Sequence, residues 1–294
     1  MAEPIRIANA SGFYGDRLAA VHEQVTLGDI DVVTGDYLAE LTMLLLWKAK
    51  QKSPEKGYAV TFLRQMEATL GEIASRGVKV VANAGGLNPA GLADELRTMI
   101  EGLGLSLRVA HVEGDNLLPV IDDLVDLEVQ TLTANAYLGA WGIAEALGRG
   151  ADIVVTGRVA DAALVVGPAA WHHEWRRDDW DALAGAVVAG HVLECGAQAT
   201  GGNFAFFREV QDLTRAGFPI AEIAADGSSV ITKHEGTGGA VTVGTITAQI
   251  LYEIDEPAYR TPDVVAHFDT IELSQIGPDC VEITGVQGSP APEL

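Results

Sequence analysis

Val80-Val81-Ala82-Asn83-Ala84-Gly85-Gly86 is a short apolar run that leads into a polar turn with glycines, and a segment with helical spacing follows it. The same order recurs at residues 7–12, 32–36, 109–115 and 153–158. The apolar runs are rich in Val and Ile, which suits strands that are buried on both faces of a parallel sheet. The repetition therefore predicts an α/β fold with a Rossmann-like open, mainly parallel sheet flanked by helices.

The five turns indicate where a ligand binds. In an open parallel sheet, ligands bind outside the carboxyl ends of the strands. Because each turn follows such an end, we expect the residues near positions 12, 35, 85, 114 and 157 to gather along one edge of the molecule. This edge is the predicted functional site.

The composition is that of an acidic globular protein. The 294 residues are 48% hydrophobic, which is enough for a sizeable core. With 19 Lys and Arg against 41 Asp and Glu, the formal net charge is -22. Because this charge repels phosphate backbones and anionic lipid, we expect neither nucleic acid nor a membrane surface as a partner.

The chain shows no membrane or secretion signal. No stretch approaches the roughly 20 apolar residues that span a bilayer, and the start lacks the basic flank and apolar core of a signal peptide. Two cysteines, Cys195 and Cys280, form neither a disulfide framework nor a CxxC motif. These features predict a cytoplasmic protein.

The chain divides into two parts that differ in composition and hydrophobic pattern. Residues 1–200 read as the α/β domain with glycine-rich loops at its strand ends. Helical spacing predicts helices at residues 16–25, 37–50, 61–76, 89–103, 117–125, 135–147, 159–170 and 180–199. Residues 201–294 read as a second, smaller, β-rich α+β lobe, with strand-like runs at 221–224, 229–232, 264–268 and 280–284 and a helix at 241–252. Residues 288–294 read as a Pro-rich tail.

Several motifs carry a family resemblance. They are NAGGLNP at residues 83–89, NAYLGA at 135–140, TGRVAD at 156–161, GGNF at 201–204 and GTGG at 236–239, with Tyr252-Glu253-Ile254 after them. From about residue 5 to residue 290 the chain resembles the acyclic terpene utilization AtuA family. Because members of that family usually continue further, the resemblance implies a C-terminally truncated chain with an incomplete second lobe. It also implies a role in the catabolism of branched acyclic terpenoids such as citronellol and geraniol, whose intermediates are carboxylated acyl-CoA thioesters.

Acidic side chains cluster after the strand-end glycines. Asp16, Asp36, Asp115 and Asp161 each follow such a glycine within four residues, and Glu113 precedes another. Carboxylates gathered on one edge predict either a divalent cation site, for Mg²⁺ or Mn²⁺, or one carboxyl with a raised pKa for proton transfer. Capping of the following helices is the alternative for each aspartate.

The sequence offers candidates for a catalytic base and for a group that binds a substrate carboxylate. We assign the base to the pair of Glu113 and Asp115 or to His234. Arg158, at a strand end, is placed to bind a substrate carboxylate, and pairing with Asp161 is the alternative. His191 and Cys195 share a helix face, where Cys195 reads as a small buried hydrophobe.

Glycine turns predict contacts to anionic or oxyanion groups. The loop 236–239, ahead of a helix near Val241, offers free N–H groups at a positive dipole end, and a flexible hairpin is the alternative. No nucleotide fingerprint is present. The predicted ligand-binding residues are Ser11, Gly12, Asn83, Gly85, Gly86, Asn135, Gly201, Gly202, Asn203, Gly236, Thr237, Gly238 and Gly239.

Together these features predict an enzyme that acts on a carboxylated, CoA-activated branched acid by lyase or hydratase-type chemistry, with CoA as part of the substrate. Both reactions need a base and donors that hold an oxyanion or enolate. The alternative is a substrate-binding or large assembly subunit that requires a small partner protein. A homo-oligomer is expected in either case.

Overall fold

The computed structural model describes residues 3–126 and 130–292 of the chain. Its centre is a nine-stranded mixed sheet with the order β10-β11-β7-β6-β1-β2-β3-β5-β4. The parallel strands are β1 (Ile5–Asn9), β2 (Val32–Gly35), β3 (Lys79–Ala82), β5 (Ile153–Thr156) and β4 (Val109–Val112). Antiparallel pairing adds β6 (Pro219–Ile223), β7 (Ser229–Lys233), β11 (Cys280–Thr284) and β10 (Glu272–Gly277) on the other side of β1.

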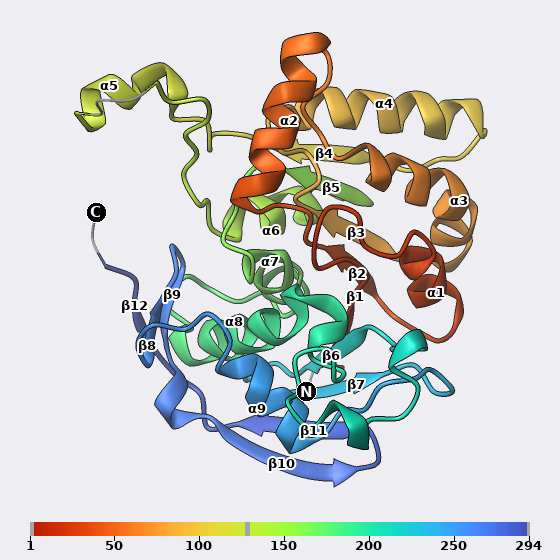
Figure 1. The fold of residues 1–294 in the computed structure, drawn as a ribbon, viewed down its shortest axis with the longest axis vertical. Helices are drawn as coiled ribbons and strands as arrows, with labels where there is room; N and C mark the ends of the chain where they lie inside the picture. The colour runs from red at the N-terminus through yellow and green to blue at the C-terminus, as the bar shows by residue number, and fades with distance from the viewer. Residues whose placement is uncertain (1–2, 127–129, 293–294) are drawn as a thin grey trace.

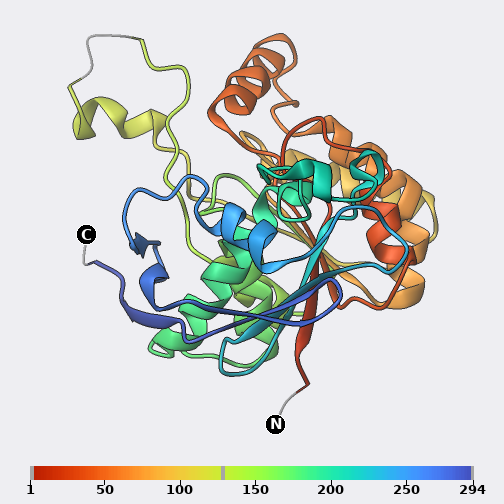
Figure 2. The same ribbon diagram turned by 60° about the horizontal axis from the view of Figure 1, so that its bottom comes forward.

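Helices cover both faces of this sheet (Figures 1 and 2). One face packs against α1 (Ala20–Thr26), α3 (Val60–Arg76) and α4 (Pro89–Gly102). The other face packs against α6 (Trp141–Gly148), α7 (Ala163–His172), α8 (Trp180–Glu194) and α9 (Val243–Ile250). The chain also forms α2 (Glu40–Lys52) and α5 (Ile121–Leu124), and short 3-10 helices at Leu118–Val120, Gly196–Gln198, Phe207–Glu209, Leu213–Arg215 and Phe268–Thr270.

Successive side chains along each strand point to opposite faces of the sheet, so the sheet has one hydrophobic core on each face. In β2, Val32 belongs to the core on the α8 side and Val33 to the core on the α3 side. Val81 and Val80 of β3 divide in the same way. Because both faces are covered, these strands are apolar throughout, as the sequence predicts.

A second, three-stranded antiparallel sheet, β12 (Gln287–Pro290), β9 (Val264–His267) and β8 (Ala258–Arg260), packs against α8. Residues 182–194 of α8 are therefore buried all round its axis, since the helix lies between two sheets. The strand β12 corrects the prediction of a tail, because residues 288–290 pair with β9.

The structure confirms an α/β chain with a large mixed sheet. The Rossmann-like character and the division near residue 200 stay predictions. The part beyond residue 200 continues the same sheet, because β6 pairs with β1.

The predicted helices exist, but several begin later than expected. α2 starts at Glu40 instead of residue 37, and α6 starts at Trp141 instead of residue 135. Polar residues after the strands make local turns first: the Asp36 carboxylate, for example, accepts a hydrogen bond from the backbone N–H of Leu38. Within the described ranges, no helix combines the length and apolar composition needed to cross a membrane.

Candidate active site

The turns after the parallel strands meet at one edge of the sheet, as the sequence predicts. The backbone N–H of Asp36 donates to the carbonyl oxygen of Ser11 at 2.9 Å, which joins the turns after β1 and β2. Gly85 packs so closely on the turn after β5 that a Cβ there would lie 2.5 Å from the Thr156 carbonyl oxygen. The edge therefore brings together loops that are far apart in the sequence.

Two carboxyls on these loops, Asp36 and Asp161, lie close enough to interact directly, and we call them the carboxyl pair. Asp36 is 6% exposed, and its Oδ1 accepts from Asn83 Nδ2 at 2.6 Å and from the Leu38 N–H at 3.1 Å. Burial raises the pKa of Asp36 to about 6. Burial, together with the negative charge of Asp36, raises the pKa of Asp161 to about 8. At neutral pH the pair therefore holds one proton.

Arg158 lies beside the carboxyl pair with its guanidinium buried. Its Nη1 donates to the Leu38 carbonyl oxygen at 2.8 Å and is 3.6 Å from Asp161 Oδ1. Its Nη2 donates to the hydroxyl of Tyr137, whose ring lies 4.5 Å from the guanidinium carbon. The structure thus places the Arg158 guanidinium beside Asp161, the pairing that the sequence offered as the alternative role of Arg158. A clamp on a substrate carboxylate stays a prediction.

Asp115 and Glu113 lie in different surroundings. Asp115 is buried, and its Oδ2 accepts from the Arg158 N–H and from Asn135 Nδ2, both at 2.8 Å. Glu113 is exposed, with its carboxylate 3.7 Å from His111 Nε2. Asp115 therefore holds the Arg158 loop in place, while the catalytic role of both residues stays a prediction.

His234 lies apart from the carboxyl pair. It follows β7, and its side chain is buried against α1, where Nε2 is 2.9 Å from the Gln24 carbonyl oxygen. Burial lowers the pKa of His234. A Cβ on Gly28 would lie 2.7 Å from its Nδ1. The contacts of the ring are therefore with α1 and the turn that follows it.

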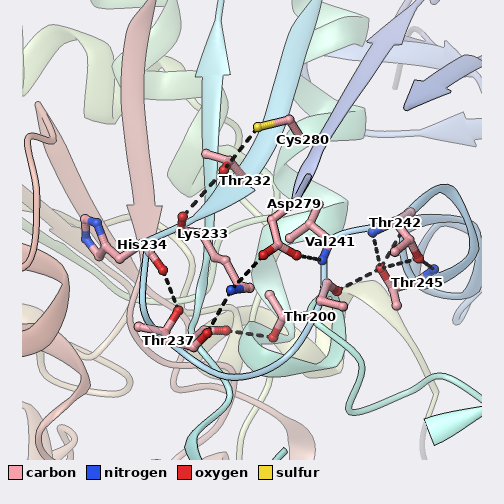
Figure 3. A network of polar contacts seen from close by, with 12 residues as sticks. Thr200, Thr232, Lys233, His234, Thr237, Val241, Thr242, Thr245, Asp279 and Cys280 are labelled. Atoms are coloured by element: carbon pink, nitrogen blue, oxygen red, sulfur yellow. Dashed lines mark hydrogen bonds and ion pairs between the residues drawn. The ribbon is translucent and has the colours of Figure 1, made fainter. Parts of the chain in front are cut away.

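The loop 236–239 differs from its prediction, and Figure 3 shows the polar network around it. Three of its backbone N–H groups donate to carbonyl oxygens, Thr237 to His234, Gly238 to Arg215 and Gly239 to Gln211. Lys233 Nζ donates to the Thr237 carbonyl oxygen and lies 3.0 Å from Asp279 Oδ2. The helix after the loop begins at Val243 with Thr242 as its cap. The interpretation of this loop as a run of free N–H groups is therefore wrong, because the chain itself accepts these bonds.

The other predicted binding turns also make internal bonds. The N–H groups of Gly201 and Asn203 donate to the Gln198 carbonyl oxygen, and that of Gly202 donates to Ala197. The Gly86 N–H donates to the Asn83 carbonyl oxygen. Asn83 has a clearer role, because its Oδ1 accepts from the Tyr37 N–H while its Nδ2 fixes Asp36. Ligand binding by these turns stays a prediction.

The carboxylates do not assemble as a metal site in the described residues. No group of three or more His, Cys, Asp or Glu side chains there is arranged to hold a metal ion. Asp16 instead accepts from the N–H groups of Gly12 and Arg17, and Asp115 accepts the two bonds given above. A divalent cation stays a prediction.

A cavity of about 730 Å³ opens at the same edge. It lies between α2 and the loops after β3 and β4, and both Asp115 and Asn135 line it. Trp47, Leu87 and Leu118 give it an apolar wall. Its volume is in the range of small-molecule sites.

The family model for the acyclic terpene utilisation family protein AtuA matches residues 5–294. The chain belongs to the AtuA family. Searches of the curated proteins and of the solved structures found no match for it. The family description suggests a role in acyclic terpene utilisation.

In this AtuA family member, sequence reasoning missed the main pairing. Asp36 and Asp161 were recognised as strand-end carboxylates, but the base was assigned elsewhere. The available signal was their position after the glycines of β2 and β5, which lie on either side of β3. Glu194, which lies near both carboxyls, carries no motif and was not singled out.

Close backbone packing at the edge gives a stability prediction. A Cβ on Gly12 would lie 2.6 Å from the backbone carbonyl carbon of Cys195, so we expect Gly12→Ala to destabilise the protein by about 1–3 kcal/mol. Gly71→Ala is the matched control, because nothing lies within 4 Å of a Cβ there, and in a helix it should stabilise by about 1 kcal/mol. Denaturant unfolding measures both, and equal stability of the two variants would contradict the packing argument.

Proposed function

We propose that this chain is an enzyme of acyclic terpenoid catabolism that acts on a carboxylated, CoA-activated branched acid by lyase or hydratase-type proton transfer. The observation that carries the proposal is the carboxyl pair, which holds one proton at neutral pH at the sheet edge. A pair of acids with separated pKa values supplies a base and an acid in one site. The family membership supports a role in acyclic terpene utilisation.

The two carboxyls have different roles in the proposed reaction. Ionised Asp36 removes a proton, from a hydroxyl in carbon–carbon cleavage or from the α-carbon in loss of water. Protonated Asp161 gives its proton to the enolate carbon or to the departing hydroxyl, respectively. Each turnover leaves one proton on Asp36 and removes one from Asp161. Because the two carboxyls interact directly, transfer of the proton from Asp36 to Asp161 restores the starting state.

Neighbouring groups support these roles. The guanidinium of Arg158 is 3.6 Å from Asp161 Oδ1, where it stabilises the carboxylate that forms after Asp161 donates its proton. Asn83 Nδ2 fixes the orientation of Asp36. Both groups are held by further bonds to the chain, so they are organised before substrate binds.

The cavity at this edge is the proposed space for the branched acyl chain. It is linked to the carboxyl pair through Asp115, which lines it and accepts a hydrogen bond from the backbone N–H of Arg158, the residue beside Asp161. Its apolar wall, with Trp47, Leu87 and Leu118, suits a hydrocarbon. Its polar side chains, including Asn135 and Lys50, provide hydrogen-bonding groups for the carboxylate or thioester end. We also propose that the chain forms a homo-oligomer or binds a small partner subunit. Neither assembly is needed for the proton transfer described above.

The test uses the full chain with a hydroxylated, carboxylated branched acyl-CoA thioester in D₂O, with and without Mg²⁺. We expect cleavage or dehydration products by mass spectrometry, with deuterium from solvent at the carbon that receives a proton. Asp94→Asn, on the exposed surface of α4, is the control and should be as active as the unchanged chain. If thioesters of this class remain unchanged in every condition, the proposed chemistry is wrong.

One observation favours the alternative of a substrate-binding or assembly subunit. The segment that carries α5 projects from the body in both views (Figures 1 and 2), and Val120, Leu124 and Val125 on it are exposed. A binding subunit would be stabilised against heat by the thioester without forming product. Product formed by this chain alone would reject that alternative.

A further inference from the structure

The last turn of α8 carries a buried acid and a buried histidine. His191 is 1% exposed and Glu194 is 9% exposed. His191 Nδ1 lies 3.2 Å from Glu194 Oε1. The second oxygen, Oε2, is buried and has no hydrogen-bond partner within the described residues. Burying a carboxyl oxygen without a hydrogen-bond partner costs folding free energy. The position of Glu194 therefore calls for an explanation.

Two close contacts bring this turn to the carboxyl pair. A Cβ on Gly190 would lie 2.8 Å from the Cα and Cβ of Ala162, the residue after Asp161. Cys195, the residue after Glu194, contacts Gly12 in the turn that also accepts the Asp36 N–H. The end of α8 therefore lies against the loop that carries Asp161 and against the turn after β1, which is hydrogen-bonded to Asp36.

The charges around Glu194 come from several elements. The titratable groups that face it are His191, Cys195, Asp36, Asp161, Glu253 and Tyr259. Burial raises the pKa of Glu194, and the nearby imidazole of His191 opposes this rise. Burial lowers the pKa of His191, but Glu194 and the carbonyl groups near the end of α9 raise it overall. His191, whose pKa is raised, therefore lies 3.2 Å from the Glu194 carboxyl and is placed to act as its cation.

We infer that Glu194 and His191 form a buried inner part of the site, in which the Glu194 carboxylate sets the protonation of the Asp36–Asp161 pair and the His191 imidazolium keeps that carboxylate charged. The inference rests on the proposed function for its catalytic meaning, while its electrostatic content stands on its own. Both residues are positioning residues, because they act through the carboxyl pair.

Removal of this negative charge should make Asp36 a stronger acid. The Glu194 carboxylate is one of the charges that raise the pKa of Asp36, so Glu194→Gln lowers it. In His191→Gln, the buried Glu194 loses its cation and takes up a proton, so the pKa of Asp36 falls in that variant too. Two different substitutions thus shift it in the same direction.

The experiment is a titration of the full chain labelled with ¹³C at the aspartate carboxyls, followed by NMR, with Asp36→Asn to assign the Asp36 signal. We expect the Asp36 midpoint to fall by about one pH unit in Glu194→Gln and in His191→Gln. Cys195→Ser, an uncharged change at the neighbouring position, should leave the midpoint unchanged. Glu194→Asp keeps the charge and should stay close to the unchanged chain.

An unchanged Asp36 midpoint in His191→Gln, or in Glu194→Gln where that variant folds, would overturn the inference. The titration needs no substrate, so its result is separate from that of the thioester assay. If the midpoints shift while all thioesters remain unchanged, the proposed function fails and the inner part of the site stands. If product forms and the midpoints do not move, the proposed function stands alone.

Discussion

Asp161→Asn is expected to lower kcat by about 10²–10⁴-fold, because an amide cannot deliver the proton that the protonated carboxyl supplies. Asp36→Asn is expected to cost a similar factor, since it removes the base. In the unchanged chain, activity should rise with pH through about 6, where Asp36 ionises, and fall through about 8, where Asp161 loses its proton. Steady-state kinetics from pH 5 to pH 9 measure both limbs.

The control for these variants is again Asp94→Asn, whose carboxylate pairs with Arg97 on the surface of α4. It should keep both the rate and the pH profile. Full activity in Asp161→Asn would show that another group donates the proton, and the predicted base candidates Glu113 and Asp115 would then be the next to test. Loss of only one limb of the profile would identify which carboxyl controls it.

Local sequence signals were sufficient for the sheet and its functional edge. The runs at residues 32–35 and 80–82 are apolar throughout, and such strands require cover on both faces. Parallel pairing then places their turns at one edge without any further information. The pairing of β6 with β1 was beyond local reasoning, because residues 219–223 show only a strand-like composition and nothing that selects a partner.

The site itself was predictable only in part. The position of Asp36 after a strand-end glycine indicated a functional carboxyl or a cap, but its partner depends on how the β5–α7 loop folds back. Backbone hydrogen bonds were a second source of error, since the glycines of loop 236–239 satisfy their N–H groups with carbonyls of residues 211, 215 and 234. Sequence spacing does not reveal such bonds, because their acceptors include residues far along the chain.

The same carboxyl that supports catalysis is expected to destabilise the protein at high pH. The pKa of Asp161 is raised from 3.8 to about 8 in the folded state, so folding favours its protonated form. Its contribution to stability is therefore complete below pH 4 and is lost as pH rises through about 8. At about 1.4 kcal/mol per pH unit, the loss amounts to several kcal/mol. Asp161→Asn, which cannot ionise, should escape this loss.

Thermal unfolding of Asp161→Asn and the unchanged chain at pH 4, 6 and 9 measures the effect. We expect similar midpoints at pH 4 and a gap of at least about 5 °C in favour of the variant at pH 9. Asp36→Asn is the matched comparison: the pKa of Asp36 is raised only to about 6, so its smaller gap should open between pH 4 and pH 6 and then stay constant. Parallel curves for all three proteins would mean that neither carboxyl has a raised pKa. Because the Asp36 gap stops growing near pH 6 while the Asp161 gap grows until about pH 8, a general effect of removing negative charge from an acidic protein cannot produce both.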